Sequence, residues 1–404
     1  MVQESSTTRH RTLLAALGDA NDQQTYSGTP YHFLHYARSQ GILDEGLRLL
    51  VKGPKWRLRR VAWNGAQWLT GDRCGGYQYS VPFLENLWAS SQSQCHGSVI
   101  VNCFQMFPPS IVADQSVEKW FFIDQTLLQL FDYYGYRTLA GRRIVQDSLY
   151  REKEGYLAAT GIIANSKWAA RDVIDNYGVP PSRVHVVQLG ANITPEDYSL
   201  WEREAASSHL QLGSRALRLV FVGKDWRRKG LDRLIRALQM ARRAGSTASL
   251  RVIGCAREDV SEDLRNAQGV QWMGFIDKGI NPIRFLSSVS ECDLGCLLSR
   301  SEAGGIGLLE YHALGLAVLG PLTGGTPEGA IDGASILCSP AMPDEEIADL
   351  LLSLDRDRSR VEQMRAISWA QRRTVLWENS LSQLRAFWPY PHENAVVVED
   401  TPIL

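Results

Sequence analysis

A glycine-rich run between two glutamates is the part of this sequence best suited to chemistry. The run Ser301–Glu310 contains three glycines and leads into an apolar, helix-forming segment. A glycine-rich turn at a helix start leaves backbone N–H groups unpaired and pointing one way, which favours an anion such as a diphosphate. Glu302 and Glu310 are negatively charged and would repel a phosphate, but their carboxylates can accept hydrogen bonds from sugar and ribose hydroxyls. The run therefore predicts a nucleotide-sugar site.

A basic loop upstream offers positive charge for the same ligand. It lies at the end of the strand expected at Leu217–Lys224 and contains Lys224, Arg227, Arg228 and Lys229. Ligands of open α/β sheets bind beyond the carboxyl ends of the strands, where such cations can neutralise a departing diphosphate. Basic clusters are more often solvated loops. The glycine-rich run in the same half of the chain is what favours the binding role here.

The composition is that of a globular protein without a bias toward nucleic acid. Of the 404 residues 44% are hydrophobic and 22% charged, and 43 Lys and Arg balance 44 Asp and Glu. Nucleic-acid binders usually carry a basic excess, so we expect no nucleic-acid partner, and the length predicts two domains. The seven scattered cysteines favour free thiols in a reducing cytoplasm, and Cys292 and Cys296 are better explained as strand thiols than as half a metal site.

No targeting or membrane-spanning segment is expected. Residues 1–5 are polar, and the first apolar run, Leu13–Leu17, is too short for a signal peptide. Residues 52–68 interleave lysines and arginines with tryptophans. This pattern is compatible with docking on an anionic membrane surface, but charge runs are more often solvated faces, and the segment could also line an acceptor cleft. We expect a cytoplasmic protein, peripheral at the inner membrane face if the first alternative holds.

The second half of the chain alternates between strand-like and helix-like patterns. Strands are expected at Leu217–Lys224, Leu250–Cys255, Val270–Phe275, Asp293–Ser299 and Leu316–Gly320. Helices are expected at Leu231–Ala241, Ile280–Val289 and Ile306–Leu314. Near-continuous apolar strands separated by helices predict a parallel sheet covered on both faces. This half is therefore expected to be a Rossmann-like α/β domain.

The first half is less regular but fits the same class. Strands are expected at Arg11–Leu17, Val99–Cys103, Ile162–Asn165 and Arg183–Leu189, with a helical region at Thr126–Tyr156. Thr29 before Pro30 predicts the N-cap of a helix that stops at Gly41.

The expected domain division follows from these patterns. Residues 1–195 form an N-terminal domain on the acceptor side, 196–215 a linker, and 216–375 the nucleotide-sugar-binding domain. A C-terminal helix and tail at 376–404 is expected to pack back on the N-terminal domain.

Five segments resemble retaining glycosyltransferases of family 4, the group 1 glycosyl transferases. In the family's order these are Tyr26–Ala37, Ala164–Ile193, Phe221–Leu238, Ser301–Gly320 and Thr323–Gly333. Two glutamates at this separation are common by chance, but the Lys-Gly motif upstream and the Gly-Gly-x-Pro-Glu loop downstream make the pattern specific. The resemblance is strongest in the second domain and implies the GT-B architecture, in which two Rossmann-like domains face each other across a cleft.

The resemblance also implies roles for individual side chains. Arg228 and Lys229, together with Lys224, would bind the donor diphosphate. Glu302 would accept hydrogen bonds from the hydroxyls of the donor sugar, and Glu310 from those of the ribose.

Backbone groups and the first domain would complete the donor site. Hydrogen bonds to sugar and phosphate would come from the N–H groups of Gly304, Gly305, Ile306 and Gly307. Gly28 would approach the phosphates from the opposite wall, and the base would lie against the loop at Phe275.

The sequence departs from the family at two positions. Family members usually carry an aromatic residue where this chain has Gly304, which could alter the sugar pocket. Many members have a first-domain histidine near the reacting carbon. Here Asp124 stands in the comparable region, either in that catalytic role beside Lys229, Arg228 and Glu302, or as a helix N-cap.

No metal or cofactor is expected. His32 and His35 have metal-ligand spacing but no second ligand pair, and Asp355-Arg356-Asp357 mimics a metal-binding motif without a strand before it. No P-loop occurs, and no Gly-x-Gly-x-x-Gly follows a strand.

We expect the chain to move a hexose from a nucleoside-diphosphate sugar to a hydroxyl of a glycan, lipid-linked sugar or small molecule, retaining the anomeric configuration. Two alternatives stay open. One is a nucleotide-sugar epimerase or sugar phosphorylase on the same fold, and the other is a non-catalytic nucleotide-sugar-binding protein.

Overall fold

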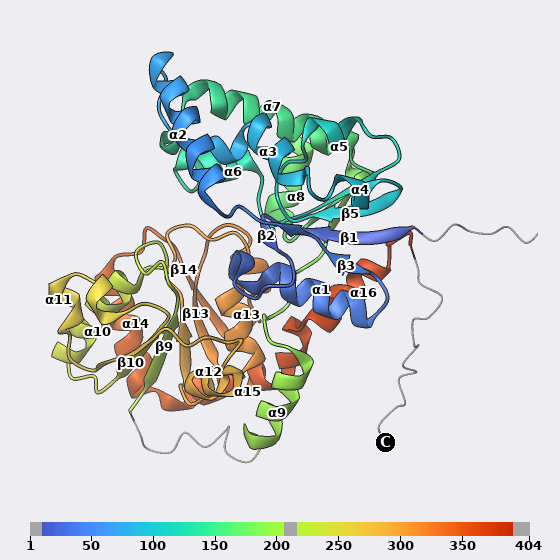
Figure 1. The fold of residues 1–404 in the computed structure, drawn as a ribbon. Helices are drawn as coiled ribbons and strands as arrows, with labels where there is room; N and C mark the ends of the chain where they lie inside the picture. The colour runs from blue at the N-terminus through green and yellow to red at the C-terminus, as the bar shows by residue number, and fades with distance from the viewer. Residues whose placement is uncertain (1–9, 206–215, 391–404) are drawn as a thin grey trace, which may run out of the picture. The chain divides into compact units, whose positions relative to one another are not determined.

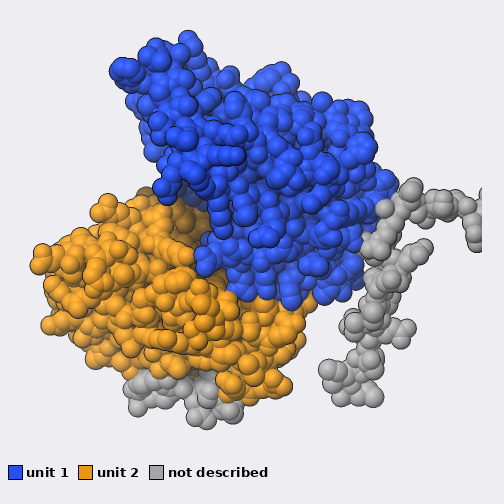
Figure 2. Space-filling view, in the orientation of Figure 1, with its two compact units in different colours: residues 1–187, 381–404 blue, residues 188–380 orange. Residues whose placement is uncertain are grey.

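The computed structural model describes residues 10–205 and 216–390 of the chain. They belong to two compact units, which Figure 2 shows in different colours. Unit 1 comprises residues 1–187 and 381–404, and unit 2 comprises residues 188–380.

Unit 1 is built on a parallel six-stranded sheet in the order β3-β1-β5-β6-β7-β8. The strands are β1 (Arg11–Ala15), β3 (Glu45–Gly46), β5 (Ser98–Asn102), β6 (Glu118–Ile123), β7 (Gly161–Ala164) and β8 (Val184–Val186). Every residue of β5 and β7 is buried. Such strands are typical of a sheet covered on both faces, and helices do cover both faces (Figure 1).

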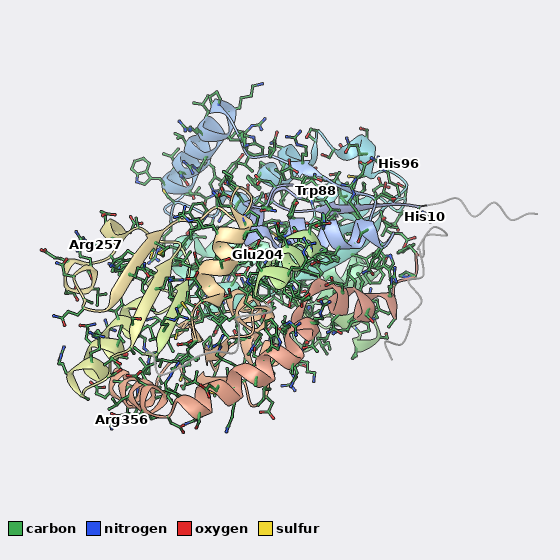
Figure 3. The ribbon with its side chains drawn as sticks, turned by 90° about the horizontal axis from the view of Figure 1, so that it is seen from below. His10, Trp88, His96, Glu204, Arg257 and Arg356 are labelled. Carbon is green, nitrogen blue, oxygen red and sulfur yellow. The ribbon has the colours of Figure 1, made fainter. Side chains whose placement is uncertain are left out.

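Unit 1 also contains α-helices and two short strands. The helices are α1 (Thr29–Ser39), α2 (Pro54–Leu69), α3 (Val81–Trp88), α4 (Gln92–Cys95), α5 (Pro109–Ala113), α6 (Leu127–Asp132), α7 (Arg142–Ala158) and α8 (Lys167–Asp175). The short strands β2 (Gly18–Asp19) and β4 (Arg48–Leu49) pair antiparallel. Trp88, labelled in Figure 3, ends α3 inside the core, where its ring lies 5.5 Å from that of Phe107.

Unit 2 repeats this architecture with the strand order β11-β10-β9-β12-β13-β14. The strands are β9 (Arg218–Val222), β10 (Ser249–Ile253), β11 (Val270–Gly274), β12 (Leu294–Cys296), β13 (Ala317–Pro321) and β14 (Ser335–Cys338). The helices are α9 (Pro195–Ala205), α10 (Leu231–Arg243), α11 (Glu262–Arg265), α12 (Pro282–Ser290), α13 (Ile306–Ala313), α14 (Asp344–Arg356) and α15 (Arg358–Gln371). The predicted class, parallel α/β in both halves, is confirmed.

Several details differ from expectation. The N-cap of α1 is Gly28, with φ of 90°, and Thr29 is already the first helical residue. Gly28 has no side chain that could accept from the first N–H groups of the helix, and its left-handed φ is one that glycine adopts without strain. β6 was not predicted as a strand. The segment expected to be a linker starts as helix α9, and its residues 206–215 lie outside the described part.

The C-terminal segment begins in unit 2 and ends in unit 1. Helix α16 spans Trp377–Arg385. After it, the ring of Phe387 stacks on His185 at 3.8 Å and that of Trp388 lies 5.1 Å from Trp120. Both partners belong to the unit 1 sheet, which explains why residues 381–390 group with that unit.

Candidate functional site

The two informative motifs of the second half meet at the carboxyl ends of neighbouring strands of unit 2. β9 and β12 lie side by side, so the loops that leave them start at the same edge of the sheet. The Leu298 N–H donates to the carbonyl of Lys229 at 3.2 Å, and the Arg300 N–H to that of Arg228 at 2.8 Å. Backbone hydrogen bonds therefore join the basic loop to the glycine-rich run.

Arg228 links the two motifs through its side chain as well. Its Nη1 donates to Glu302 Oε2 at 3.2 Å and to the Ser301 carbonyl at 2.9 Å. Its Nε donates to Asp225 Oδ2 at 3.3 Å, and the Ser299 hydroxyl donates to Glu302 at 3.0 Å. The guanidinium is thus shared by two carboxylates, and it orients Glu302.

The start of α13 has room for a ligand. Gly305 is its N-cap, with φ of 62°, and a Cβ there would come within 2.9 Å of Thr326 Cγ2. A Cβ on Gly307, by contrast, would meet no atom within 4 Å. The first N–H groups of a helix have no partner within it, so the open space beside Gly307 is where an anion could accept from them.

Gly304, the departure from the family pattern, has a steric explanation. A Cβ on this residue would come within 2.5 Å of Leu189 Cδ1. The Leu189 side chain occupies the volume that a larger residue at position 304 would need.

Buried contacts of its own side chains hold helix α13 in place within unit 2. Tyr311 accepts a hydrogen bond from the Val222 N–H at 2.9 Å, and its ring lies on Gly295, where a Cβ would clash at 2.2 Å. His312 lies between the hydroxyls of Ser335 and Ser368, each at 2.9 Å. Burial lowers the pKa of His312 to about 3, so this side chain is neutral and positions the helix.

Glu310 has a partner that the sequence did not reveal. Its side chain is only 4% exposed and forms an ion pair with Lys278, in the loop after β11. The Lys278 ammonium also lies 4.3 Å from the ring centre of Phe285. Glu310 and Lys278 lie too far apart in the chain for a spacing rule to connect them. Lys278 does follow the carboxyl end of a strand, however, and Lys224 was singled out from the sequence for the same reason.

The other two predicted lysines lie at the same edge. The Lys224 ammonium lies 4.3 Å from the ring centre of Phe275, which brings the loops after β9 and β11 together. The Lys229 side chain crosses Gly223 so closely that a Cβ there would come within 2.5 Å of its Cδ. No ion pair in the described part of the chain involves either ammonium.

Thr326 is a further candidate that sequence reasoning did not single out. Its hydroxyl is buried against Gly305 and has no hydrogen-bond partner within the described ranges. The preceding Gly325 N–H donates to the Ala303 carbonyl at 2.8 Å. The Gly-Gly-x-Pro-Glu loop is therefore bonded to the glycine-rich run, and its threonine places an unsatisfied hydroxyl beside the start of α13.

The two predicted residues of unit 1 lie at the carboxyl edge of its own sheet. Gly28 caps α1, after Tyr26 and Ser27, which also have positive φ. Partial desolvation of the Tyr26 side chain, which is 46% exposed, and the neighbouring Asp124 carboxylate raise the pKa of Tyr26. The cap alternative for Asp124 is wrong, because Thr126 caps α6 in a reciprocal capping box with Gln129.

Unit 1 contains a cavity of about 970 Å³ beside the same edge. Its polar lining includes two carboxylates and three cations, Asp19, Asp22, Lys52, Arg57 and Arg60. Its aromatic lining is formed by Tyr26, Trp56, Tyr77 and Phe83. No hydrogen bond or ion pair holds the three cations among residues 10–205 and 216–390.

The remaining candidates have structural explanations. Asp355 accepts from the Leu217 N–H, the Ser246 hydroxyl and the Thr247 N–H at 3.1, 2.7 and 2.9 Å. Cys296 is fully buried in β12, and burial raises the pKa of Cys292 to about 11. Within the described residues no cluster of three His, Cys, Asp or Glu side chains could hold a metal. No helix there is long and apolar enough to cross a membrane.

Comparisons of the sequence with known proteins agree with this geometry. Residues 202–371 match the family model described as glycosyl transferases group 1. Relatives named D-inositol 3-phosphate glycosyltransferase include that of Nocardia farcinica, 30% identical over 255 residues, and that of Rhodococcus opacus, 27% identical over 231. These alignments cover 59% and 55% of this chain and 55% and 51% of the relatives, so the chain spans about half the length of the curated relatives it matches.

Solved structures match over nearly the whole chain. Sucrose-phosphate synthase from Thermosynechococcus elongatus aligns with a TM-score of 0.66 at 13% identity, covering 94% of this chain and 98% of that one. Anabaena HepE in complex with UDP-glucose aligns with a TM-score of 0.57 at 14% identity, covering 93% and 100%. The chain therefore has the GT-B fold, and its second half carries a domain of the glycosyl transferases group 1 family.

Proposed function

We propose that this chain transfers a hexose from a nucleoside-diphosphate sugar to an acceptor hydroxyl, retaining the anomeric configuration. The observation that carries the proposal is the joined site of unit 2. There the open start of α13, the oriented Glu302 and the nearly buried Glu310 lie on one glycine-rich segment, bonded to the basic loop. An anion site flanked by two hydroxyl acceptors matches a diphosphate with a sugar at one end and a ribose at the other.

We further propose UDP as the nucleotide of the donor. The support is the likeness to Anabaena HepE, whose structure contains UDP-glucose. In this chain the base would stack near Phe275, 55% exposed, with the ribose hydroxyls on Glu310.

In the proposed reaction the bond between the anomeric carbon and the diphosphate oxygen breaks, and a bond to the acceptor oxygen forms. The leaving diphosphate gains charge as the bond breaks. The ammonium of Lys229 and the N-terminus of α13 would stabilise this charge without a divalent metal. For Asp124 we propose the catalytic role that the family resemblance implies.

The cavity of unit 1 would hold the acceptor. The relatives are named for a phosphorylated polyol, D-inositol 3-phosphate, and the lining of this cavity suits that class of compound. Lys52, Arg57 and Arg60 would bind the phosphate, while Asp19 and Asp22 would accept hydrogen bonds from hydroxyls.

Thermal unfolding with a panel of nucleotides tests the donor site first. A ligand that binds only the folded chain raises the melting temperature, so UDP and UDP-glucose should raise it and CMP should not. Glu310→Gln should abolish the shift, while Glu362→Gln, an exposed residue of α15, should leave it intact. No shift with any nucleotide or nucleotide sugar would refute the donor site.

Activity is then measured as UDP release with phosphorylated and unphosphorylated polyols, with and without EDTA. Release that requires acceptor and withstands EDTA is expected. Conversion of the donor without acceptor would identify an epimerase instead, a requirement for free phosphate a phosphorylase, and donor binding with no turnover a binding protein.

A further inference from the structure

Helix α2 presents large apolar side chains to the outside of unit 1. None of its residues is buried. Leu58, Val61, Trp68 and Leu69 are 69%, 68%, 72% and 78% exposed. Scattered exposed leucines are normal, but a contiguous apolar patch marks an interaction surface.

The spacing of these side chains puts them on one face of the helix. Positions 58, 61, 68 and 69 recur at helical intervals, with Gly65 between them. We call these four side chains the outer stripe.

The opposite face of α2 attaches it to the core. The ring of Trp56 lies 5.2 Å from that of Phe83, and the Trp63 Nε1 donates to the Gly75 carbonyl at 3.0 Å. Because the inner tryptophans satisfy the packing of α2, the outer stripe is not needed to hold the helix.

Positive charge surrounds the outer stripe. Five cations lie in and just before the helix: Lys52, Arg57 and Arg60, which also line the cavity of unit 1, and Lys55 and Arg59, which do not. No acidic residue occurs between Glu45 and Asp72. In Figure 1 the end of α2 extends beyond the neighbouring helices of unit 1, and Figure 2 shows it as a projection from that unit's surface. Side chains along α2 stand out from the ribbon in Figure 3.

We propose that α2 docks this chain on an anionic lipid bilayer, lying in the plane of the interface with the outer stripe in the headgroup and acyl boundary. An apolar stripe flanked by lysines and arginines is what binds such a surface. A second copy of the chain is a poorer occupant, because Lys55 and Arg59 would then lie against like charges of the other copy. The proposal does not depend on the proposed function, since it concerns binding to lipid alone.

Sedimentation with vesicles tests the proposal on the full chain. Binding is expected to vesicles of phosphatidylcholine and phosphatidylglycerol in equal parts, at least tenfold tighter than to phosphatidylcholine alone, and should weaken between 0.1 and 0.5 M salt. Lys55→Gln with Arg59→Gln should weaken binding about 25-fold, because each basic side chain near such a surface contributes about fivefold. Leu58→Gln with Trp68→Gln should weaken it at least tenfold.

Matched controls use exposed side chains of unit 1 outside α2. Leu139→Gln, at 62% exposed, controls for the apolar pair, and Lys153→Gln with Arg171→Gln for the basic pair. Both should bind within twofold of the unaltered chain, and all variants should keep its melting temperature.

Two results would overturn the proposal. One is absent binding to the anionic vesicles, or binding that both α2 variants retain in full. The other is a lipid-free dimer that Leu58→Gln with Trp68→Gln dissociates, measured by analytical ultracentrifugation, which would assign the outer stripe to a second copy.

Discussion

Replacing Gly307 by alanine should stabilise the fold and at the same time weaken the donor. Gly307 lies in the first turn of α13 with ordinary negative φ, and a Cβ there meets no atom within 4 Å. The added methyl group therefore causes no clash within the protein. It enters the space that we assign to the diphosphate.

The two effects have separate magnitudes. Alanine loses less backbone entropy than glycine in a helix, which should raise the free energy of unfolding by about 0.5–1 kcal/mol. For a unit of this size that raises the melting temperature by roughly 1–4 °C. Loss of one hydrogen bond to a charged phosphate costs about 1.5–3 kcal/mol, so the Kd for UDP should rise roughly 10- to 150-fold.

Gly305→Ala provides the contrasting control. Its φ of 62° and the 2.9 Å approach to Thr326 Cγ2 forbid a side chain. This variant should lose roughly 1–2 kcal/mol of stability from the backbone strain alone. The change in the free energy of unfolding should thus be positive for Gly307→Ala and negative for Gly305→Ala.

Urea unfolding and isothermal titration with UDP measure the two quantities on the same preparations. A Gly307→Ala protein that binds UDP as tightly as the unaltered chain would refute the placement of the diphosphate at α13. A Gly307→Ala protein with a lower free energy of unfolding than the unaltered chain would show that other atoms fill the space beside Gly307 in solution.

Four further outcomes are expected. Glu310→Gln should leave the Lys278 ammonium without a carboxylate and raise the Michaelis constant for the donor. An unchanged Michaelis constant would show that Glu310 does not contact the donor. Lys229→Ala should mainly lower kcat, because its charge matters most when the diphosphate leaves; unchanged kcat would contradict that role. Burial raises the pKa of Glu152 from 4.5 to about 8. The contribution of Glu152 to the free energy of unfolding is therefore fully present below pH 4.5 and is lost as the pH rises through 8. Urea unfolding of Glu152→Gln should lack that fall, up to about 5 kcal/mol. The pKa of His312 is lowered to about 3 from 6.5, so stability should fall as the pH drops from 6.5, and less so in His312→Gln.

The strands of unit 2 could be predicted because their chemistry is local. A strand buried on both faces must be apolar at nearly every position, and β9 and β13 meet that requirement within a few consecutive residues. The cap of α6 was equally readable. Thr126 and Gln129 have capping-box spacing, so the alternative role given to Asp124 could have been rejected from the sequence.

Other features depend on contacts between distant segments. Leu189 fills the volume beside Gly304, although more than a hundred residues separate them. The outer stripe of α2 is recognisable only once its inner tryptophans are known to contact Phe83 and Gly75. Composition alone therefore favoured a solvated face or the lining of an acceptor cleft over membrane docking.

The pairing of charges in the unit 2 site carries a consequence for the proposed reaction. Arg228 is bound to Glu302, and Glu310 to Lys278, so a donor must share these partners rather than meet free ones. Such pairs orient the side chains in advance and reduce the entropy lost on binding, but each shared contact contributes less net attraction. The ammonium groups of Lys224 and Lys229 form no ion pair in the described ranges. The Lys224 ammonium lies on the ring of Phe275, 4.3 Å from its centre, whereas the backbone of Lys229 is bonded to the loop after β12. We therefore propose Lys229 as the cation that acts on the diphosphate.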